Sequence, residues 1–395
     1  MHFEKGLFYK MKRILIKNAK VYTLDNIIER GAILIEDGLI KEIFPDTREW
    51  PEVETVIDGS NCNLIPGFID GHIHGANGAD VMDATEEALT KMASFLPAEG
   101  TTSFLATTIT QAPENIEKAL QNVARYQNKP GHAEIVGIHL EGPFVEKKRA
   151  GAQPQEFIAE PDVELFNQWQ HLSGQNIKTI TMAPEHSKDG SFINTLYQAG
   201  INVSAGHTDT NFQGMKKAVS EGVRQVTHLC NAMSGIHHRD IGVVGAAFQL
   251  EELQAELICD GIHVSPEMMQ LIFNNMGSSR LIMITDSMRA KGLPPGEYEL
   301  GGQPVKVTED RAVLEDGTLA GSILKMHDGA KQMLSLSGVS MRDIIQMASV
   351  NPAKQIGLFG RKGSITVGKD ADVLLVDDNM NIQYTICRGV IAYKG

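Results

Sequence analysis

Histidine and acidic side chains recur in short motifs that lie far apart along this chain of 395 residues, which contains 13 histidines. Most of these motifs lie at the end of a segment rich in apolar and β-branched residues. The candidates are His72, His74, Glu141, His207, His228, His263 and Asp286. Imidazole and carboxylate groups together are suitable ligands for Zn²⁺, Fe²⁺ or Mn²⁺. These residue types therefore indicate a site for a divalent metal, provided that the fold brings the segments together.

Eight apolar segments in the middle of the chain are the expected strands that position these groups. They are 64–74, 101–110, 134–142, 177–185, 201–208, 223–230, 255–261 and 279–286. Amphipathic stretches such as 84–96 and 113–126 lie between most of them, with apolar residues at helical spacing. This alternation predicts an α/β fold, a (β/α)8 TIM barrel. A doubly wound open sheet is the alternative, but the Gly-rich dinucleotide turn is missing after the first strand.

Functional side chains of such a barrel lie at the C-terminal ends of its strands. Alternation along the first strand places His72 and His74 on one face, directed toward the barrel mouth. For any single histidine, a hydrogen bond to a carbonyl of the core would explain the residue equally well. The joint pattern favours a metal, because a purely structural explanation would bury several costly polar groups together.

Both ends of the chain are rich in short β-strand patterns. Segments 13–23, 31–37 and 39–44 precede the barrel, and 370–395 resembles a three-stranded meander. We therefore expect a small β-sandwich domain formed by both chain termini. The predicted division is 12–66 plus 356–395 for this domain and 67–355 for the catalytic barrel.

The composition limits the classes of partner. Lys+Arg is 36 and Asp+Glu is 49, so the net charge is −13, which argues against nucleic acid. No apolar run approaches the roughly 18 residues of a membrane span, and the opening residues lack the apolar region of a signal peptide. The four cysteines have neither metal nor redox spacing, so we expect a cytoplasmic protein. An anionic ligand would need a local positive cluster, and 236–240 (IHHRD) supplies one.

Several motifs, taken in order and spacing, resemble a known family. They are LIPGFIDGHIHG (64–75), HLEGPF (139–144), SAGHT (204–208), THLCNAM (227–233), CDGIHV (259–264), ITDSM (284–288), LAGS (319–322), ASVNPAKQIGL (348–358) and GSITVGKDADVLLVD (363–377). Together they are similar to the amidohydrolase superfamily and, within it, to the family of N-acetylglucosamine-6-phosphate deacetylases. The resemblance runs from about residue 12 to the end of the chain.

The resemblance implies a metal centre at the strand ends. Glu141, His207 and His228 resemble the ligands of the principal metal. His72 and His74 resemble ligands of a second metal, with Glu141 as the bridge. Some family members carry Gln-x-Asn in place of this H-x-H and keep one metal. The expected cofactor is therefore a divalent metal, Zn or Fe with Mn as a further candidate, at one or two ions per subunit.

The same resemblance implies an activity and the residues that perform it. Asp286 resembles the catalytic acid/base for hydrolysis of the acetamide of N-acetyl-D-glucosamine 6-phosphate to D-glucosamine 6-phosphate and acetate. Such a reaction belongs to amino-sugar catabolism and cell-wall sugar recycling. The groups that resemble contacts to the phosphorylated amino-sugar substrate are Asn231, Ala232, Arg239, His263, Ala152, Leu319, Ala320 and Gly321. In the family, the arginine that Arg239 resembles reaches into the active site of the neighbouring subunit, which implies a homodimer.

Alternatives remain at this level. A cyclic-amide hydrolase of the same superfamily commonly uses a carboxylated lysine on strand four, but Lys178 lies at the wrong end of that segment. A non-enzymatic phosphosugar sensor would have lost a metal ligand or Asp286, and none is missing. Gln153 is a candidate contact to the acetamide. The sequence leaves open whether the enzyme prefers the glucosamine or the galactosamine epimer of the substrate. It also leaves open the native metal and the roles of His237 and His238.

Overall fold

The computed structural model describes residues 13–45 and 50–395, so the predicted domain start at residue 12 lies outside the described residues. Its largest unit is a sheet of eight parallel strands in the order β15-β14-β13-β12-β11-β10-β9-β6. The strands are β6 (Phe68–Ile73), β9 (Thr101–Thr107), β10 (Glu134–Glu141), β11 (Ile177–Met182), β12 (Asn202–Ala205), β13 (Val223–Val226), β14 (Gln254–Ile258) and β15 (Leu281–Ile284). Each lies within or closely overlaps one of the eight predicted segments.

The sheet closes where its last strand meets its first. Ile73 and Ser287 form a parallel bridge. The amide of Asp286 donates to the carbonyl of His72 at 2.8 Å, and the amide of His74 donates to the carbonyl of Ser287 at 2.9 Å. These contacts place the ends of β6 and β15 side by side, and they confirm the predicted TIM barrel in place of an open sheet.

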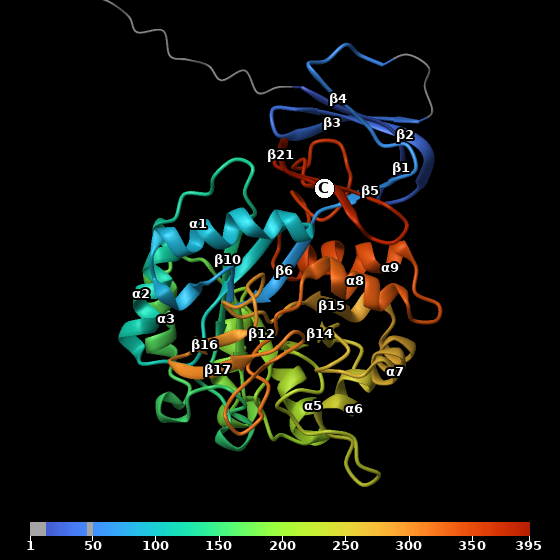
Figure 1. The fold of residues 1–395 in the computed structure, drawn as a ribbon. Coiled ribbons are helices and arrows are strands. Elements are labelled where there is room, and N and C mark those ends of the chain that lie inside the picture. Colours follow the sequence, from blue (N-terminus) through green and yellow to red (C-terminus); the bar gives the residue numbers. More distant parts are fainter. Residues whose placement is uncertain (1–12, 46–49) are drawn as a thin grey trace, which may run out of the picture.

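Helices surround the barrel on its outer side (Figure 1). They are α1 (Glu86–Phe95), α2 (Pro113–Arg125), α3 (Val163–Leu172), α4 (Ser191–Gln198), α5 (Phe212–Glu221), α6 (Gly242–Gln249), α7 (Pro266–Met276), α8 (Met326–Leu334), α9 (Met341–Ile345) and α10 (Asn351–Gln355). Helix α2 shows why these segments are helical: Pro113 occupies the first turn, and Ile116, Ala119, Leu120 and Val123 form one buried stripe. Within the described ranges, no helix has the length and apolar character needed to cross a membrane.

A second sheet combines both ends of the chain. Figure 1 shows its blue N-terminal and red C-terminal strands together, outside the barrel. Its path is β21-β20-β19-β5-β1-β2-β3, with β4 paired to β1. The strands are β1 (Ile14–Tyr22), β2 (Ile27–Glu36), β3 (Leu39–Pro45), β4 (Thr55–Asp58), β5 (Asn63–Pro66), β19 (Val373–Val376), β20 (Ile382–Cys387) and β21 (Val390–Lys394). Antiparallel pairing of Ile65 with Leu374 joins the two ends, and Ile16, Ile33 and Leu375 lie in a separate core. The exact division of domains stays a prediction.

Two smaller sheets lie beside the barrel mouth: a hairpin of β7 (Gly75–Ala76) with β8 (Ala79–Asp80), and a three-stranded sheet that follows β15. The latter consists of β16 (Gly296–Leu300), β17 (Gln303–Val307) and β18 (Ala312–Val313). Its Leu300 and Val305 pack in a hydrophobic cluster with Met288 and Ile109. This cluster holds the three-stranded sheet against the loops that carry the candidate functional residues.

Candidate metal centre and active site

A cavity of about 340 Å³ lies at the C-terminal ends of the barrel strands. The predicted residues that line it are His74, Glu141, Ala152, His207, His228, Asn231, Ala232, His263, Asp286, Leu319 and Gly321. His72 is fully buried directly behind this lining, and its ring contacts Glu141. The fold therefore brings together groups that are separated by more than 200 positions in the sequence, such as His74 and Asp286.

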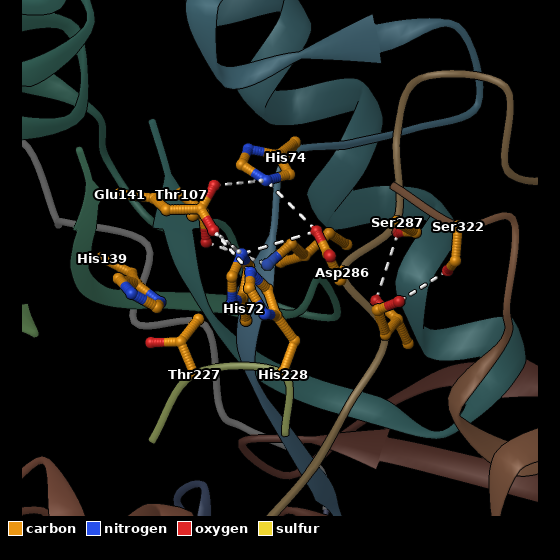
Figure 2. A network of polar contacts seen from close by, with 12 residues as sticks. His72, His74, Thr107, His139, Glu141, Thr227, His228, Asp286, Ser287 and Ser322 are labelled. Carbon is orange, nitrogen blue, oxygen red and sulfur yellow. Dashed lines mark hydrogen bonds and ion pairs between the residues drawn. The ribbon is translucent and has the colours of Figure 1, made fainter. Parts of the chain in front are cut away.

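Four imidazole rings converge on the carboxylate of Glu141, which ends β10. The Nε2 atoms of His72, His207 and His228 each lie 3.3 Å from its Oε1. The Nε2 atom of His74 lies 3.3 Å from its Oε2. Figure 2 shows His72, His74 and His228 directed toward Glu141. A carboxylate between two sets of imidazoles has the arrangement of a group that bridges two cations.

The chemistry of these donors fits one or two divalent metals. His72, His74 and Glu141 offer ligand atoms within 4.8 Å of one another, and so do Glu141, His207 and His228. The buried Nε2 of His72 has no hydrogen-bond partner of adequate geometry among the residues described. Nitrogen and carboxylate donors in such sets suit Zn²⁺, Fe²⁺ or Mn²⁺. A bound cation would use the lone pair that the protein leaves without a partner.

The electrostatics of the site also require positive charge. Burial raises the pKa of Glu141, but the nearby His72 and hydrogen bonds from His207 and His228 outweigh burial and hold that pKa well below its usual range. Burial likewise raises the pKa of Asp286, yet the charge of His72 and a hydrogen bond from His74 lower it to about 2. The groups that face them thus hold both carboxylates ionised, and a divalent metal can supply positive charge at the same place.

The strand ends aim these side chains through unusual backbone conformations. His207, His228 and Asp286 have positive φ values of 48°, 31° and 48°. Such left-handed geometry costs a non-glycine residue about 1–3 kcal/mol and is concentrated at functional sites. It turns the chain at the end of the strand and directs each side chain into the barrel mouth.

Asp286 is positioned by a hydrogen-bond network across the closing seam. Its Oδ1 lies 3.2 Å from His74 Nε2. The preceding Thr285 donates its hydroxyl to Asp70 at 2.6 Å, and the Ser322 hydroxyl donates to the carbonyl of Thr285 at 2.5 Å. Because Asp70 also accepts the amide of His72 at 3.3 Å, the network ties the acid/base candidate to the histidine pair.

Two predicted substrate contacts do not line the cavity. Ala320 is fully buried between its lining neighbours. Arg239 lies in the exposed 236–240 loop, where its Nη1 contacts His238 Nε2 at 2.6 Å. Within this chain, therefore, the structure does not bring Arg239 to the site.

Other residues at the site had no firm role in the sequence analysis. Lys148 and Arg149 line the cavity and add positive charge, and the KKR run at 147–149, two residues after the HLEGPF motif, was an available signal. Gln153, the candidate contact to the acetamide, also lines the cavity; it donates to Glu141 Oε2 at 2.7 Å and accepts the amide of Thr110 at 2.9 Å. This side chain therefore orients the shared carboxylate.

A closed (β/α)8 barrel whose strand ends gather histidines around a shared carboxylate defines a class of metal-dependent hydrolases. The model of the amidohydrolase family matches residues 63–392, and the chain belongs to this family. It is 48% identical over 384 residues to the N-acetylglucosamine-6-phosphate deacetylase of Bacillus subtilis (strain 168), with 96% of this chain and 97% of that protein covered.

Solved structures agree with this relationship. The N-acetylglucosamine-6-phosphate deacetylase from Pasteurella multocida superposes with a TM-score of 0.90 at 28% identity, covering 97% of this chain and all of that one. A mutant of the Mycobacterium smegmatis enzyme in complex with N-acetyl-D-glucosamine-6-phosphate has a TM-score of 0.89 at 26% identity, with 97% and 100% covered. These two deacetylases thus match 97% of this chain.

Proposed function

We propose that this chain hydrolyses the acetamide of N-acetyl-D-glucosamine 6-phosphate to D-glucosamine 6-phosphate and acetate, with the aid of a divalent metal. The observation that carries the proposal is the convergence of four imidazoles on Glu141, with Asp286 beside them, in a cavity that also presents His263 and Asn231. The relative of 48% identity and the substrate complex of a relative support the same activity.

The metal ligands of this proposal form two sets that share one carboxylate. Glu141, His207 and His228 would hold the principal ion, and His72 and His74 with Glu141 would hold a second. Zn and Fe are the preferred candidates, with Mn as a third, at one or two ions per subunit. When bound, such an ion supplies Lewis acidity toward the amide carbonyl and lowers the pKa of a water to about 7.

Asp286 has the position and the charge of the catalytic acid/base. Its carboxylate lines the cavity and is held ionised at neutral pH, because its pKa is lowered to about 2. As an ionised carboxylate beside the residues that would hold the metal, it is placed to accept a proton from the attacking water, whose own pKa the metal would lower. The same carboxyl group then donates that proton to the amine, which must be protonated to leave.

The remaining cavity residues would orient the phosphosugar. His263 and Asn231 offer polar groups, and the backbone at Ala152, Ala232 and the 319–321 segment follows the cavity wall. The phosphate needs a cationic partner, which we assign to Arg239 of a neighbouring subunit in a homodimer. Arg239 is exposed and is not among the residues that line this chain's own cavity, which supports that assignment.

The same proposal includes a cellular setting and a domain division. We place the enzyme in the cytoplasm, in amino-sugar catabolism and cell-wall sugar recycling, with no nucleic-acid or membrane partner. Within the described part of the chain, all four cysteines are free, which agrees with a reducing compartment. Residues 12–66 with 356–395 would form the terminal domain, and 67–355 the catalytic barrel.

Acetate release tests the proposed function directly. Protein stripped with a chelator is loaded with Zn²⁺, Fe²⁺ or Mn²⁺ and given N-acetylglucosamine 6-phosphate, its galactosamine epimer or unphosphorylated N-acetylglucosamine. We expect fast release from the first substrate and little from the last. No release with any of the three metals would refute the proposal.

A further inference from the structure

A buried carboxylate lies behind the metal centre and is not one of the ligands assigned above. Glu256, in β14, is 2% exposed. Its Oε2 lies 3.0 Å from His72 Nδ1 and accepts the amide of His228 at 3.3 Å. The side chain thus contacts one residue from each of the two sets of ligands, on the side away from the cavity.

A line of amide side chains leads from Glu256 through the barrel interior to its other end. Gln225 Nε2 donates to Glu256 Oε1 at 2.7 Å. Asn202 Nδ2 donates to Gln225 Oε1 at 3.0 Å, and Gln355 Nε2 donates to Asn202 Oδ1 at 2.6 Å. Asn202 and Gln225 are buried, whereas Gln355, at the end of α10, is partly exposed. Each amide donates toward Glu256, so the line ends on a group that only accepts.

This arrangement determines the tautomer of His72. An ionised carboxylate offers acceptors alone, and Gln225 and the His228 amide already donate to Glu256. The His72 Nδ1 atom must therefore carry its hydrogen and donate it to Glu256. Metal binding requires neutral His72, and with the hydrogen on Nδ1 the Nε2 lone pair faces Glu141, which is the orientation a metal ligand needs.

The other rings lack such a partner. Among the described residues, the buried Nδ1 atoms of His74 and His228 have no hydrogen-bond partner, and His207 Nδ1 meets the backbone carbonyl of Arg149 at 2.9 Å. His72 is therefore the one ligand of this centre whose Nδ1 meets a carboxylate in the described structure. We propose that Glu256, held by Gln225, is a positioning residue that enables His72 to bind the second ion.

This inference rests on the two-ion form of the proposed function, and Zn²⁺ alone serves as the probe. Chelator-stripped full-length protein is titrated with Zn²⁺ by isothermal calorimetry, and bound zinc is counted by mass spectrometry after dialysis. We expect two ions in the wild type. In Glu256→Gln the second ion should bind about ten- to a hundredfold more weakly, the effect usual for such outer partners, while the first keeps its affinity. His72→Ala should lose the same ion.

Two further variants make the result decisive. Glu185→Gln is the control. This exposed carboxylate accepts from Thr208 and the Asp209 amide and contacts none of the ligands, so both ions should bind as in the wild type. If Glu256→Gln does not fold, Gln225→Leu replaces it, and a weaker second ion would support the proposal.

Two results would overturn the proposal: unchanged binding of both ions when Glu256 or Gln225 is replaced, or a wild type that binds one ion. Absence of acetate release by the zinc-loaded wild type would instead count against the proposed function. Acetate release and zinc binding are measured separately, so a failure of the proposed function can be distinguished from a failure of the proposed role of Glu256.

Discussion

Replacement of Asp286 by asparagine is the sharpest test of the proposed chemistry. The Asp286→Asn substitution would keep the size of the side chain and its contact with His74, 3.2 Å from Oδ1 in the structure. It would remove the negative charge and the ability to carry a proton. The backbone at this position has a φ of 48°, which asparagine tolerates better than most residues, so the fold should be retained.

The size of the expected loss follows from the role of the carboxylate. A positioned acid or base contributes roughly 10²- to 10⁴-fold to a rate, or about 3–5.5 kcal/mol of activation free energy. Asp286 lies near His72 and His74, but the pairs between Glu141 and the other two histidines do not involve it. The principal ion should therefore bind normally, and kcat should fall far more than KM changes.

The assay measures acetate release at saturating N-acetylglucosamine 6-phosphate, together with bound metal and the thermal unfolding temperature. Loss of kcat by at least about a hundredfold with one ion still bound would agree with the role of Asp286. An Asp286→Asn variant that keeps most of its kcat would refute the reasoning. Loss of both ions would show that the residue acts mainly on metal binding.

Four further outcomes are expected. Arg239→Ala should raise KM for the phosphorylated sugar about ten- to a hundredfold, the loss of one charge-assisted contact, and an equal rise for the unphosphorylated sugar would exclude phosphate binding. Lys291→Met removes the counter-charge of the buried Glu99, its partner at 2.7 Å, so urea titration should show a free energy of unfolding lower by about 3–5 kcal/mol. The double variant Lys291→Met with Glu99→Leu should recover most of that loss. Burial raises the pKa of Glu134, but Lys362 outweighs burial, so the pKa in the folded protein lies below the ordinary value of 4.5. The ionised Glu134 therefore stabilises the fold fully above about pH 4.5, and this stabilisation is lost as the pH falls through the native pKa. Glu134→Gln should flatten the acid limb of a stability profile, and an unchanged slope would contradict the assignment. Chelation should abolish acetate release and Zn²⁺ should restore it, whereas activity in metal-free protein would rule out a metal-dependent reaction.

Much of the barrel could be predicted because local sequence carries the signal. Alternating apolar segments, each ending in a polar motif, identify the strands and their C-terminal ends, as in Glu141 at the end of β10. The roles of residues whose partners come from other strands were harder to predict from the sequence. The hydrogen bond that Gln153 donates to Glu141, for example, could not be predicted from the sequence. Its loop and β10 are joined by contacts that no local pattern encodes.

The sequence by itself determined which side chains lie at strand ends, because strand period and turn chemistry are local properties. It also determined that an acidic protein of net charge −13 needs a small positive pocket for an anion. The family resemblance already implied that four imidazoles share Glu141, but only the tertiary structure showed their contacts with it and decided that Gln153 and Glu256 stand beside and behind these ligands. Barrel closure places these strands around one axis, and distances across that axis depend on the register of all eight strands together.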